Sequence, residues 1–226
     1  MEEGYRPIRS LSNYAGYYPG KRTTNGRTIS RGGALGVSEL KLLLDHINRF
    51  CPLRKPALRD LAAALKKIEI PKGGFLTTEG KICNCIYFLE KGCLLGYYNL
   101  DGKEITYWFA FENNFVTSFF SFISRKPGVE NIQLLEDGTL WSITYDELQQ
   151  LYATHPEIER LGRVMHERYY VMLEERFVAN HFKEARERYE NLATTTPHIL
   201  KRVPLGYIAS YLGITQETLS RIRSKA

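Results

Sequence analysis

The sequence LGYIASYLGITQETLSRIRSKA, residues 205–226, is the stretch around which the rest of this chain is organised. Its first apolar residues recur at the spacing of a short amphipathic helix: Leu205, Ile208, Ala209 and Leu212. Pro204 precedes that helix and Gly213 follows it, residue types preferred at a helix start and at a left-handed cap. Thr215 can cap a second helix, whose first turn carries Glu217 where the helix dipole favours an anion. Two helices joined by a short glycine-containing turn predict a helix-turn-helix, in which the second helix reads DNA.

The same pattern also fits an ordinary helical hairpin, so the side chains have to decide between the two interpretations. On the outward face of the second helix, Arg221 can pair with guanine, Gln216 with adenine and Glu217 with cytosine. Ala209 in the first helix is small enough to let the second helix cross closely. These features favour a helix that reads DNA.

Length and composition are those of an ordinary globular protein. The 226 residues allow one or two domains, with 43% hydrophobic and 25% charged residues. No run approaches the roughly 18 apolar residues of a transmembrane helix, and the N-terminus lacks the apolar region of a secretory signal. We therefore expect a cytoplasmic protein without a membrane partner.

The net charge of +6 is concentrated at the two ends of the chain. Residues 1–36 hold six Lys and Arg against two Asp and Glu, residues 37–180 hold 17 against 19, and residues 181–226 hold eight against four. A basic C-terminal segment around a helix-turn-helix fits attraction to phosphates, although solvated surface cations would give the same modest excess.

The chain before residue 37 is predicted to be a disordered leader. Residues 1–36 are rich in Gly, Arg, Ser, Asn and Tyr, and their few apolar residues show no periodicity. One hypothesis is that translation starts near Leu35 or Val37, which would make the leader non-native.

A β-rich domain is expected over residues 37–155. It begins with helices at 38–50, capped by Ser38, and at 56–67. From 68 to 145, short runs of β-formers alternate with turn signals, and the clearest hairpin is CLLGYYNL, Asp101-Gly102, KEITYWFAF. Many short strands at this spacing predict a β-sandwich or β-roll, interrupted by a short helix at 119–124.

After a short helix at 146–154, a long helix is predicted at 156–182. Apolar residues recur along it every three to five positions: Ile158, Leu161, Met165, Tyr169, Met172 and Phe177. Such a sparse seam favours pairing with a second copy of the chain, and the alternative is a single helix packed on the β-roll. Helices at about 184–192 and near His198 then lead into the helix-turn-helix, giving a C-terminal domain at 183–226.

This order of elements resembles the Crp/Fnr family of bacterial transcription regulators over about residues 40–226. The family's recognition helix typically carries an E-T-x-x-R core, which Glu217, Thr218 and Arg221 match. The segments IYFLEKG, DGKEITYWF and RVPLGYIASYLGIT resemble a branch common in Bacteroidetes. The resemblance implies an α+β fold: an N-terminal β-roll like that of cyclic-nucleotide-binding domains, a dimerisation helix and a C-terminal helix-turn-helix domain.

The resemblance also implies a function and a set of contacts. We expect a DNA-binding transcription regulator, a homodimer through residues 156–182 that binds a roughly palindromic operator and works with RNA polymerase. Base contacts and phosphate contacts would come from the second helix of the helix-turn-helix. The expected base contacts are Gln216, Glu217 and Arg221, and the expected phosphate contacts are Thr215, Thr218 and Ser220.

The sequence departs from the family where cyclic AMP binds. Members that bind it use a Gly-Glu pair for the ribose and an Arg-Ser pair for the phosphate. The approximate alignment places Thr117-Ser118 at the first pair and Asn131-Ile132 at the second, so both charged groups are missing. We therefore expect no cofactor and an effector other than cyclic AMP, with Thr117, Ser118 and Asn131 as candidates to line its pocket. A second departure is that no segment for a β-wing follows Ala226, so affinity is expected to rest on the helix and on dimerisation.

Other chemistries find little support in the sequence. The four cysteines match no common iron–sulfur or zinc spacing: Cys51, Cys83, Cys85 and Cys93. Phosphate loops, nucleophile elbows and zinc-protease motifs are missing too, so no enzyme and no metal site are expected. The remaining alternative is a small-molecule-binding module that regulates something other than DNA.

Overall fold

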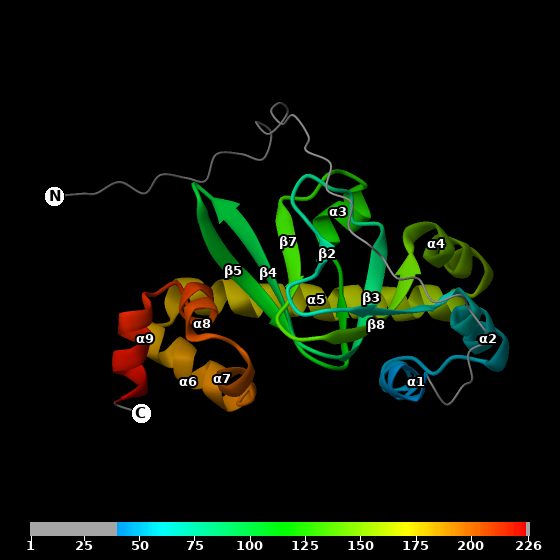
Figure 1. The fold of residues 1–226 in the computed structure, drawn as a ribbon. Helices are drawn as coiled ribbons and strands as arrows, with labels where there is room; N and C mark the ends of the chain where they lie inside the picture. The colour runs from blue at the N-terminus through cyan, green and yellow to red at the C-terminus, as the bar shows by residue number, and fades with distance from the viewer. Residues whose placement is uncertain (1–39, 225–226) are drawn as a thin grey trace.

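The computed structural model describes residues 40–224, and it consists of two antiparallel sheets, helices at both ends and one long helix (Figure 1). The expected leader, residues 1–36, and the expected cap Ser38 lie outside the described residues. The strand order is β1-β8-β3-β6 in one sheet and β2-β7-β4-β5 in the other, which confirms the predicted β-roll. The strands are β1 Lys66–Ile70, β2 Phe75–Thr77, β3 Cys85–Lys91, β4 Leu94–Leu100, β5 Lys103–Ala110, β6 Asn114–Val116, β7 Glu130–Leu134 and β8 Gly138–Thr144.

The predicted hairpin is formed by β4 and β5. Asp101 and Gly102 have φ of 49° and 79°, the left-handed conformation that a two-residue hairpin turn with a matching twist requires. The register shifts between Gly96 and Tyr97, which marks a β-bulge. A Cβ on Gly96 would lie 2.3 Å from the Trp108 ring, so the absent side chain lets that indole lie across β4.

The helices agree with the sequence prediction apart from three bounds, the first of which is the end of α1 at Asn48 where residue 50 was expected. They are α1 Lys41–Asn48, α2 Lys55–Ala64, α3 Phe119–Ser124, α4 Tyr145–Thr154, α5 Pro156–Phe182, α6 Ala185–Thr195, α7 Ile199–Arg202, α8 Leu205–Tyr211 and α9 Gln216–Arg223. The second helix was expected to reach residue 67 but ends at Ala64, because Lys66 already pairs with Ser142 of β8. The helix expected at 184–192 continues to Thr195, with Glu184 as its cap.

Two apolar cores stabilise the β-roll and the helices packed on it, α1, α2, α4 and the start of α5. Between the sheets, Leu89, Leu94, Ile132 and Leu140 are fully buried. The other face of the first sheet, with Phe88 and Trp141, is covered by α1, α2, α4 and the start of α5: Leu40, Leu43, Ile47, Leu61, Leu148, Leu151, Ile158 and Leu161.

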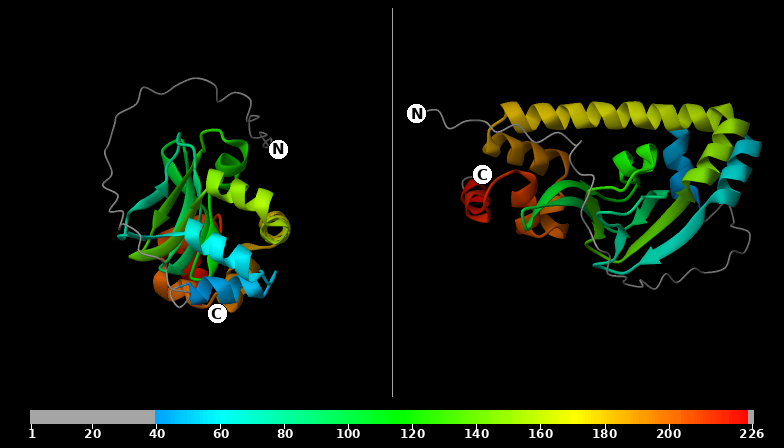
Figure 2. Two further views of the ribbon diagram at one scale, coloured as in Figure 1. Left: turned by 90° about the vertical axis from the view of Figure 1, so that its right-hand side faces the viewer. Right: turned by 90° about the horizontal axis from the view of Figure 1, so that it is seen from above.

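The long helix α5 lies along one side of the β-roll, from α1, α2 and α4 at one end to α6–α9 at the other (Figure 2). The predicted seam for a second copy is wrong for its first half, since Ile158 and Leu161 are buried inside the protomer and Met165 packs against the same core. Tyr169 stacks on Phe119 with the ring centroids 3.9 Å apart. None of the helices within residues 40–224 is long and apolar enough to cross a membrane.

Candidate nucleic-acid interface

The helices α8 and α9 pack through a small apolar core at the end of the molecule. Ile208, Ala209, Leu212 and Leu219 are buried there. Gly213 has φ of 66°, and the amide of Ile214 donates to the Ala209 carbonyl at 3.0 Å, which closes the end of α8. The order of α8, a glycine turn and α9 is the one that the sequence predicts for a helix-turn-helix.

The three residues expected to contact bases are exposed on α9. The side chains of Glu217 and Arg221 are 75% and 69% exposed, and the guanidinium donates to the carboxylate across one helical turn. Gln216 is also exposed, and its amide group lies against α8 where a Cβ on Gly206 would approach it to 2.5 Å. The structure therefore brings the three residues together on one helix, with Arg221 and Glu217 paired to each other.

The residues expected to contact phosphate have different surroundings. Thr215 is the N-cap of α9, since its hydroxyl accepts a hydrogen bond from the amide of Thr218 at 3.1 Å. Ser220 is exposed. Thr218 is partly buried and lines a depression of about 230 Å³ between α9 and α6.

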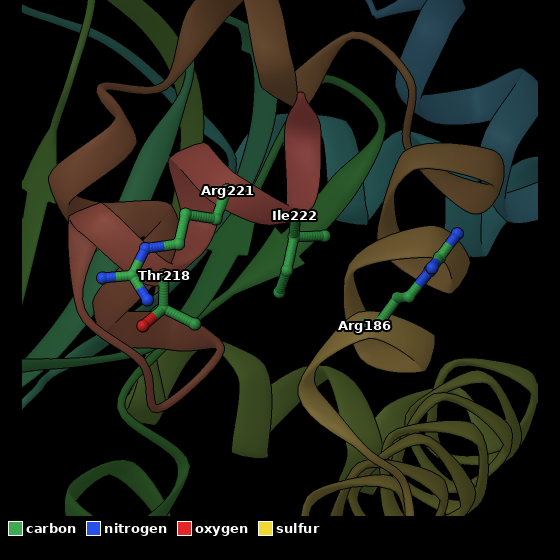
Figure 3. Close-up of a pocket in the computed structure, with 4 residues that line it drawn as sticks. All are labelled: Arg186, Thr218, Arg221 and Ile222. Carbon is green, nitrogen blue, oxygen red and sulfur yellow. The ribbon is translucent and has the colours of Figure 1, made fainter. Parts of the chain in front are cut away.

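This depression contains an arginine that the sequence analysis missed. Its lining residues are Arg186 of α6 and Thr218, Arg221 and Ile222 of α9 (Figure 3). Arg186 donates to Glu190 at 2.7 Å, an exposed pair one turn along α6. Its helix was predicted, but its approach to α9 depends on the tertiary packing of two segments more than 30 residues apart, and no local sequence pattern carries that information.

The helices α6–α9, residues 185–223, are called the helical head, and they pack against the β-roll. Phe111 and Cys93 of the β-roll share a core with Val203, Ile208 and Leu212 of the head. The hydroxyl of Ser210 in α8 accepts a hydrogen bond from the amide of Thr106 in β5 at 2.9 Å. The head is therefore held in one orientation relative to the β-roll by apolar packing and hydrogen bonds.

An ion cluster strengthens this contact. The guanidinium of Arg202 in α7 donates to both oxygens of Glu112, at 2.7 and 2.8 Å, and to both oxygens of Glu136. Hydrogen bonds from Arg202 lower the pKa of Glu112 to about 2, against the opposing effect of desolvation. The same hydrogen bonds raise the pKa of Arg202. Arg202 and Glu112 are therefore ionised near neutral pH, and together with Glu136 they form a clamp between the head and the β-roll.

The three candidates for an effector pocket are buried, and each has an internal partner. The Thr117 hydroxyl donates to the Cys85 carbonyl at 2.9 Å. The Asn131 side-chain oxygen accepts from the Glu79 amide at 3.1 Å, whereas its nitrogen is buried without a partner. Ser118 hydrogen-bonds to the carboxyl group of Glu130, a residue that the sequence analysis did not single out.

Glu130 is a buried carboxyl group next to α5, and it accepts a hydrogen bond from the indole of Trp108 at 2.8 Å. Burial raises its pKa, while hydrogen bonds from Ser118 and Trp108 and the nearby charge of Arg176 oppose the shift. Arg176 of α5 donates to the Tyr107 carbonyl at 2.7 Å and lies over the Tyr107 ring, and its second terminal nitrogen is buried without a partner.

The same region is lined by tyrosines. Burial raises the pKa of Tyr98 and raises that of Tyr169 to about 12. The charged groups of the family's two cyclic-AMP pairs are missing at the aligned positions, but Glu130 and Arg176 place other charged groups where α5 meets the β-roll. The alignment with the family's nucleotide-binding pairs could not identify these two residues, because Glu130 only neighbours the aligned pair Asn131-Ile132 and Arg176 belongs to the long helix α5.

Comparison with known proteins identifies this architecture. Residues 67–155 match the family model described as the cyclic nucleotide-binding domain. Among solved structures, the chain is similar to FixK2 from Bradyrhizobium japonicum, with 19% identity and a TM-score of 0.60 over 71% of this chain and 83% of that one. It is also similar to a candidate transcriptional regulator of the crp/fnr family from Eubacterium rectale, with 16% identity and a TM-score of 0.60 over 75% of this chain and 82% of that one. The chain has the Crp/Fnr fold.

A further match with this fold is CLP of Xanthomonas campestris, a c-di-GMP responsive global regulator. It has 17% identity and a TM-score of 0.58 over 76% of this chain and 91% of that one. No curated protein sequence matches the chain. In this member of the Crp/Fnr fold, the match to the cyclic nucleotide-binding domain covers β1 to α4 and ends where α5 begins.

The second half of α5 exposes a set of large apolar side chains, called the exposed stripe. Its members are Tyr170, Val171, Met172, Phe177, Val178 and Phe182, between 45% and 79% exposed.

Residues 40–224 hold no group of three or more His, Cys, Asp or Glu side chains arranged for a metal ion.

Proposed function

We propose that the protein is a homodimeric transcription regulator that binds DNA through α9 and carries out no catalysis. The observation that carries this proposal is the exposed face of α9, where Gln216, Glu217 and Arg221 project from the second helix of a helix-turn-helix. Such a helix fits the major groove, where amide, carboxylate and guanidinium groups distinguish adenine, cytosine and guanine.

Phosphate contacts are assigned to Thr215, Thr218 and Ser220. Contacts to phosphates fix the position of a protein on the duplex, and contacts to base edges give specificity. Thr215 and Thr218 support each other through the N-cap, with their hydroxyl oxygens 3.0 Å apart. A DNA phosphate would therefore bind a pre-ordered pair of hydroxyl groups at the start of α9.

Homodimerisation is assigned to residues 156–182 through the second half of α5. The exposed stripe contains large apolar side chains on a helix whose first half is already packed, and a patch of this kind marks an interface. A two-fold dimer presents two α9 helices to half-sites one or more helical turns apart, at about 34–36 Å per turn. The operator is therefore roughly palindromic.

The remaining assignments follow from this arrangement. Residues 37–155 form the sensor domain and residues 183–226 the DNA-binding domain, and the complex acts with RNA polymerase at promoters. The effector is a ligand other than cyclic AMP, because Thr117-Ser118 and Asn131 replace the charged pairs and the adjoining Glu130 would repel a phosphate.

Genome-wide mapping of the DNA bound by the protein in its host tests the proposal. It is expected to give enriched sites that share an inverted repeat with half-sites one or more helical turns apart. Fragments that are bound without a shared sequence would contradict sequence-specific regulation, and no enrichment at all would favour a module that regulates something other than DNA.

A further inference from the structure

The depression between α6 and α9 combines the groups that bind a phosphodiester. Arg186 lines it from α6, and Thr218, Arg221 and Ile222 line it from α9; Ile222 lies between the two arginines, and Thr218 lies beside Arg221 (Figure 3). Guanidinium groups bind phosphate oxygens through parallel hydrogen bonds, and a hydroxyl adds another donor. We propose that this depression binds one phosphate of the DNA backbone and that Arg186 is the cation that contacts it.

Arg186 is assigned this contact because Arg221 already has another partner. The guanidinium of Arg221 is paired with Glu217 on the face of α9 that points outward. Arg186 lies on the other wall of the depression and pairs only with Glu190 among the described residues, where both side chains are at least half exposed. Exposed pairs of this kind are weak, so a phosphate can replace Glu190 as the partner of the guanidinium.

The start of α6 does not offer the same site through its backbone. Glu184 caps the helix, and the side chains of Glu184 and Glu187 form a capping box with the first amides. Because two carboxylates fill the helix start, an anion is held by the Arg186 side chain rather than by free amides.

The position fits a backbone contact rather than a base contact. Thr218 follows Glu217 on α9, so the depression flanks the face that carries the proposed base contacts. A cation beside the helix that enters the major groove lies next to the phosphate backbone that borders the groove. A contact to this backbone carries no sequence information.

This inference rests on the proposed DNA-binding function, and the test separates the two. Binding is measured by fluorescence anisotropy at several salt concentrations, with a duplex from the protein's own upstream region and with a scrambled duplex. The variants are Arg186→Ala, Arg186→Lys and the matched control Arg59→Ala, which removes one exposed cation of α2 at the opposite end of the protomer (Figure 1). Thermal unfolding of each variant checks that the fold is unchanged.

Arg186→Ala is expected to lower the affinity for both duplexes by the same factor. It should also reduce the slope of log K against log salt by about 0.9 per phosphate contact, hence about 1.8 for a dimer. Arg186→Lys, which keeps the charge, is expected to keep most of the slope, and Arg59→Ala all of it. An unchanged slope for Arg186→Ala, or a loss confined to the upstream duplex, would overturn the phosphate contact and leave the proposed function standing. A wild-type protein that binds neither duplex would overturn both.

Discussion

The guanidinium of Arg202 in the helical head donates to both carboxylate oxygens of Glu112 in the β-roll, at 2.7 and 2.8 Å. These residues are 90 positions apart in the chain, so the pair depends on the tertiary arrangement of head and β-roll. Glu136 binds the same guanidinium from a second side. The orientation of α9 relative to the β-roll is therefore fixed in part by one arginine between two glutamates.

Replacing Arg202 with Ala should loosen the head. It removes a shared partner and leaves Glu112 and Glu136 facing each other, which should cost about 1–3 kcal/mol of unfolding free energy. Urea unfolding of Arg202→Ala, Glu112→Gln and the double variant would measure the coupling. The exposed Arg163–Glu167 pair of α5 is the control, where the same cycle should give about 0.3–0.5 kcal/mol. Additive effects in the Arg202 cycle would contradict the clamp.

The clamp should also depend on pH in a defined direction. The pKa of Glu112 is lowered from 4.5 to about 2, so its contribution to stability is complete above pH 4.5 and is lost as the pH falls towards 2. The difference in unfolding free energy between the wild type and Glu112→Gln should therefore be constant above pH 4.5 and shrink below it. A difference that grows on acidification would contradict the assigned shift.

The sequence predicts the elements of this fold better than it predicts their contacts. Turn residues such as Asp101-Gly102, the helix-starting Pro156 and the N-cap Thr215 act locally, so helices and hairpins could be predicted from them. The end of α2 was predicted too late, because pairing of Lys66 with β8 overrides the helical tendency of that segment. Local signals therefore locate the helices and hairpins, whereas the exact ends of a helix also depend on its tertiary surroundings.

The candidate site shows the same division. The exposed residues of α9 could be predicted because helical periodicity separates Leu219 and Ile222 from Gln216, Glu217 and Arg221. Arg186, Glu130 and Arg176 could not, since each gains its role from a segment distant in the chain. The same holds for Ile158 and Leu161, which form a helical seam in sequence and a core in the protomer.

Replacing Glu130 with Gln should stabilise the protein at neutral and higher pH. Burial raises the pKa of this carboxyl above 4.5, so the cost of its charge is absent below pH 4.5 and grows as the pH rises through the folded-state value. Gln keeps an acceptor for Trp108 without the charge, and its gain in Tm should vanish towards pH 4.5. Glu130→Leu leaves the indole N–H unpaired and should cost about 1–3 kcal/mol. Equal losses of Tm in both variants would argue that the ionised form is required.

Charges on the exposed stripe of α5 should separate the proposed dimer. Val171 and Val178 are 53% and 45% exposed in the protomer. Burying a valine contributes about 1.5 kcal/mol or more, so Val171→Glu with Val178→Glu should raise the dimer Kd by well over tenfold. Sedimentation equilibrium measures the change, with Leu100→Glu at the end of β4 as a control for an exposed apolar residue. A dimer that survives the double variant would place the interface elsewhere.

Replacing Arg221 with Ala should relax specificity. Loss of a guanidinium bidentate to guanine is expected to cost about 1–3 kcal/mol at that base pair and to leave binding at the other positions nearly unchanged. Competition binding between operators that differ at a single base pair measures this change in specificity directly. Arg223→Ala, which removes an exposed cation from the same helix, should weaken all operators alike. Unchanged selectivity in Arg221→Ala would remove this residue from the base contacts.

The central claim is that this chain binds DNA as a regulator, and a salt-dependent gel shift on its own promoter region tests it most directly. A dimer that holds several phosphates should bind that duplex more tightly than a scrambled one, with an affinity that falls steeply and linearly in log K against log salt. Binding that shows neither a preference for the promoter duplex nor a dependence on salt would contradict the account.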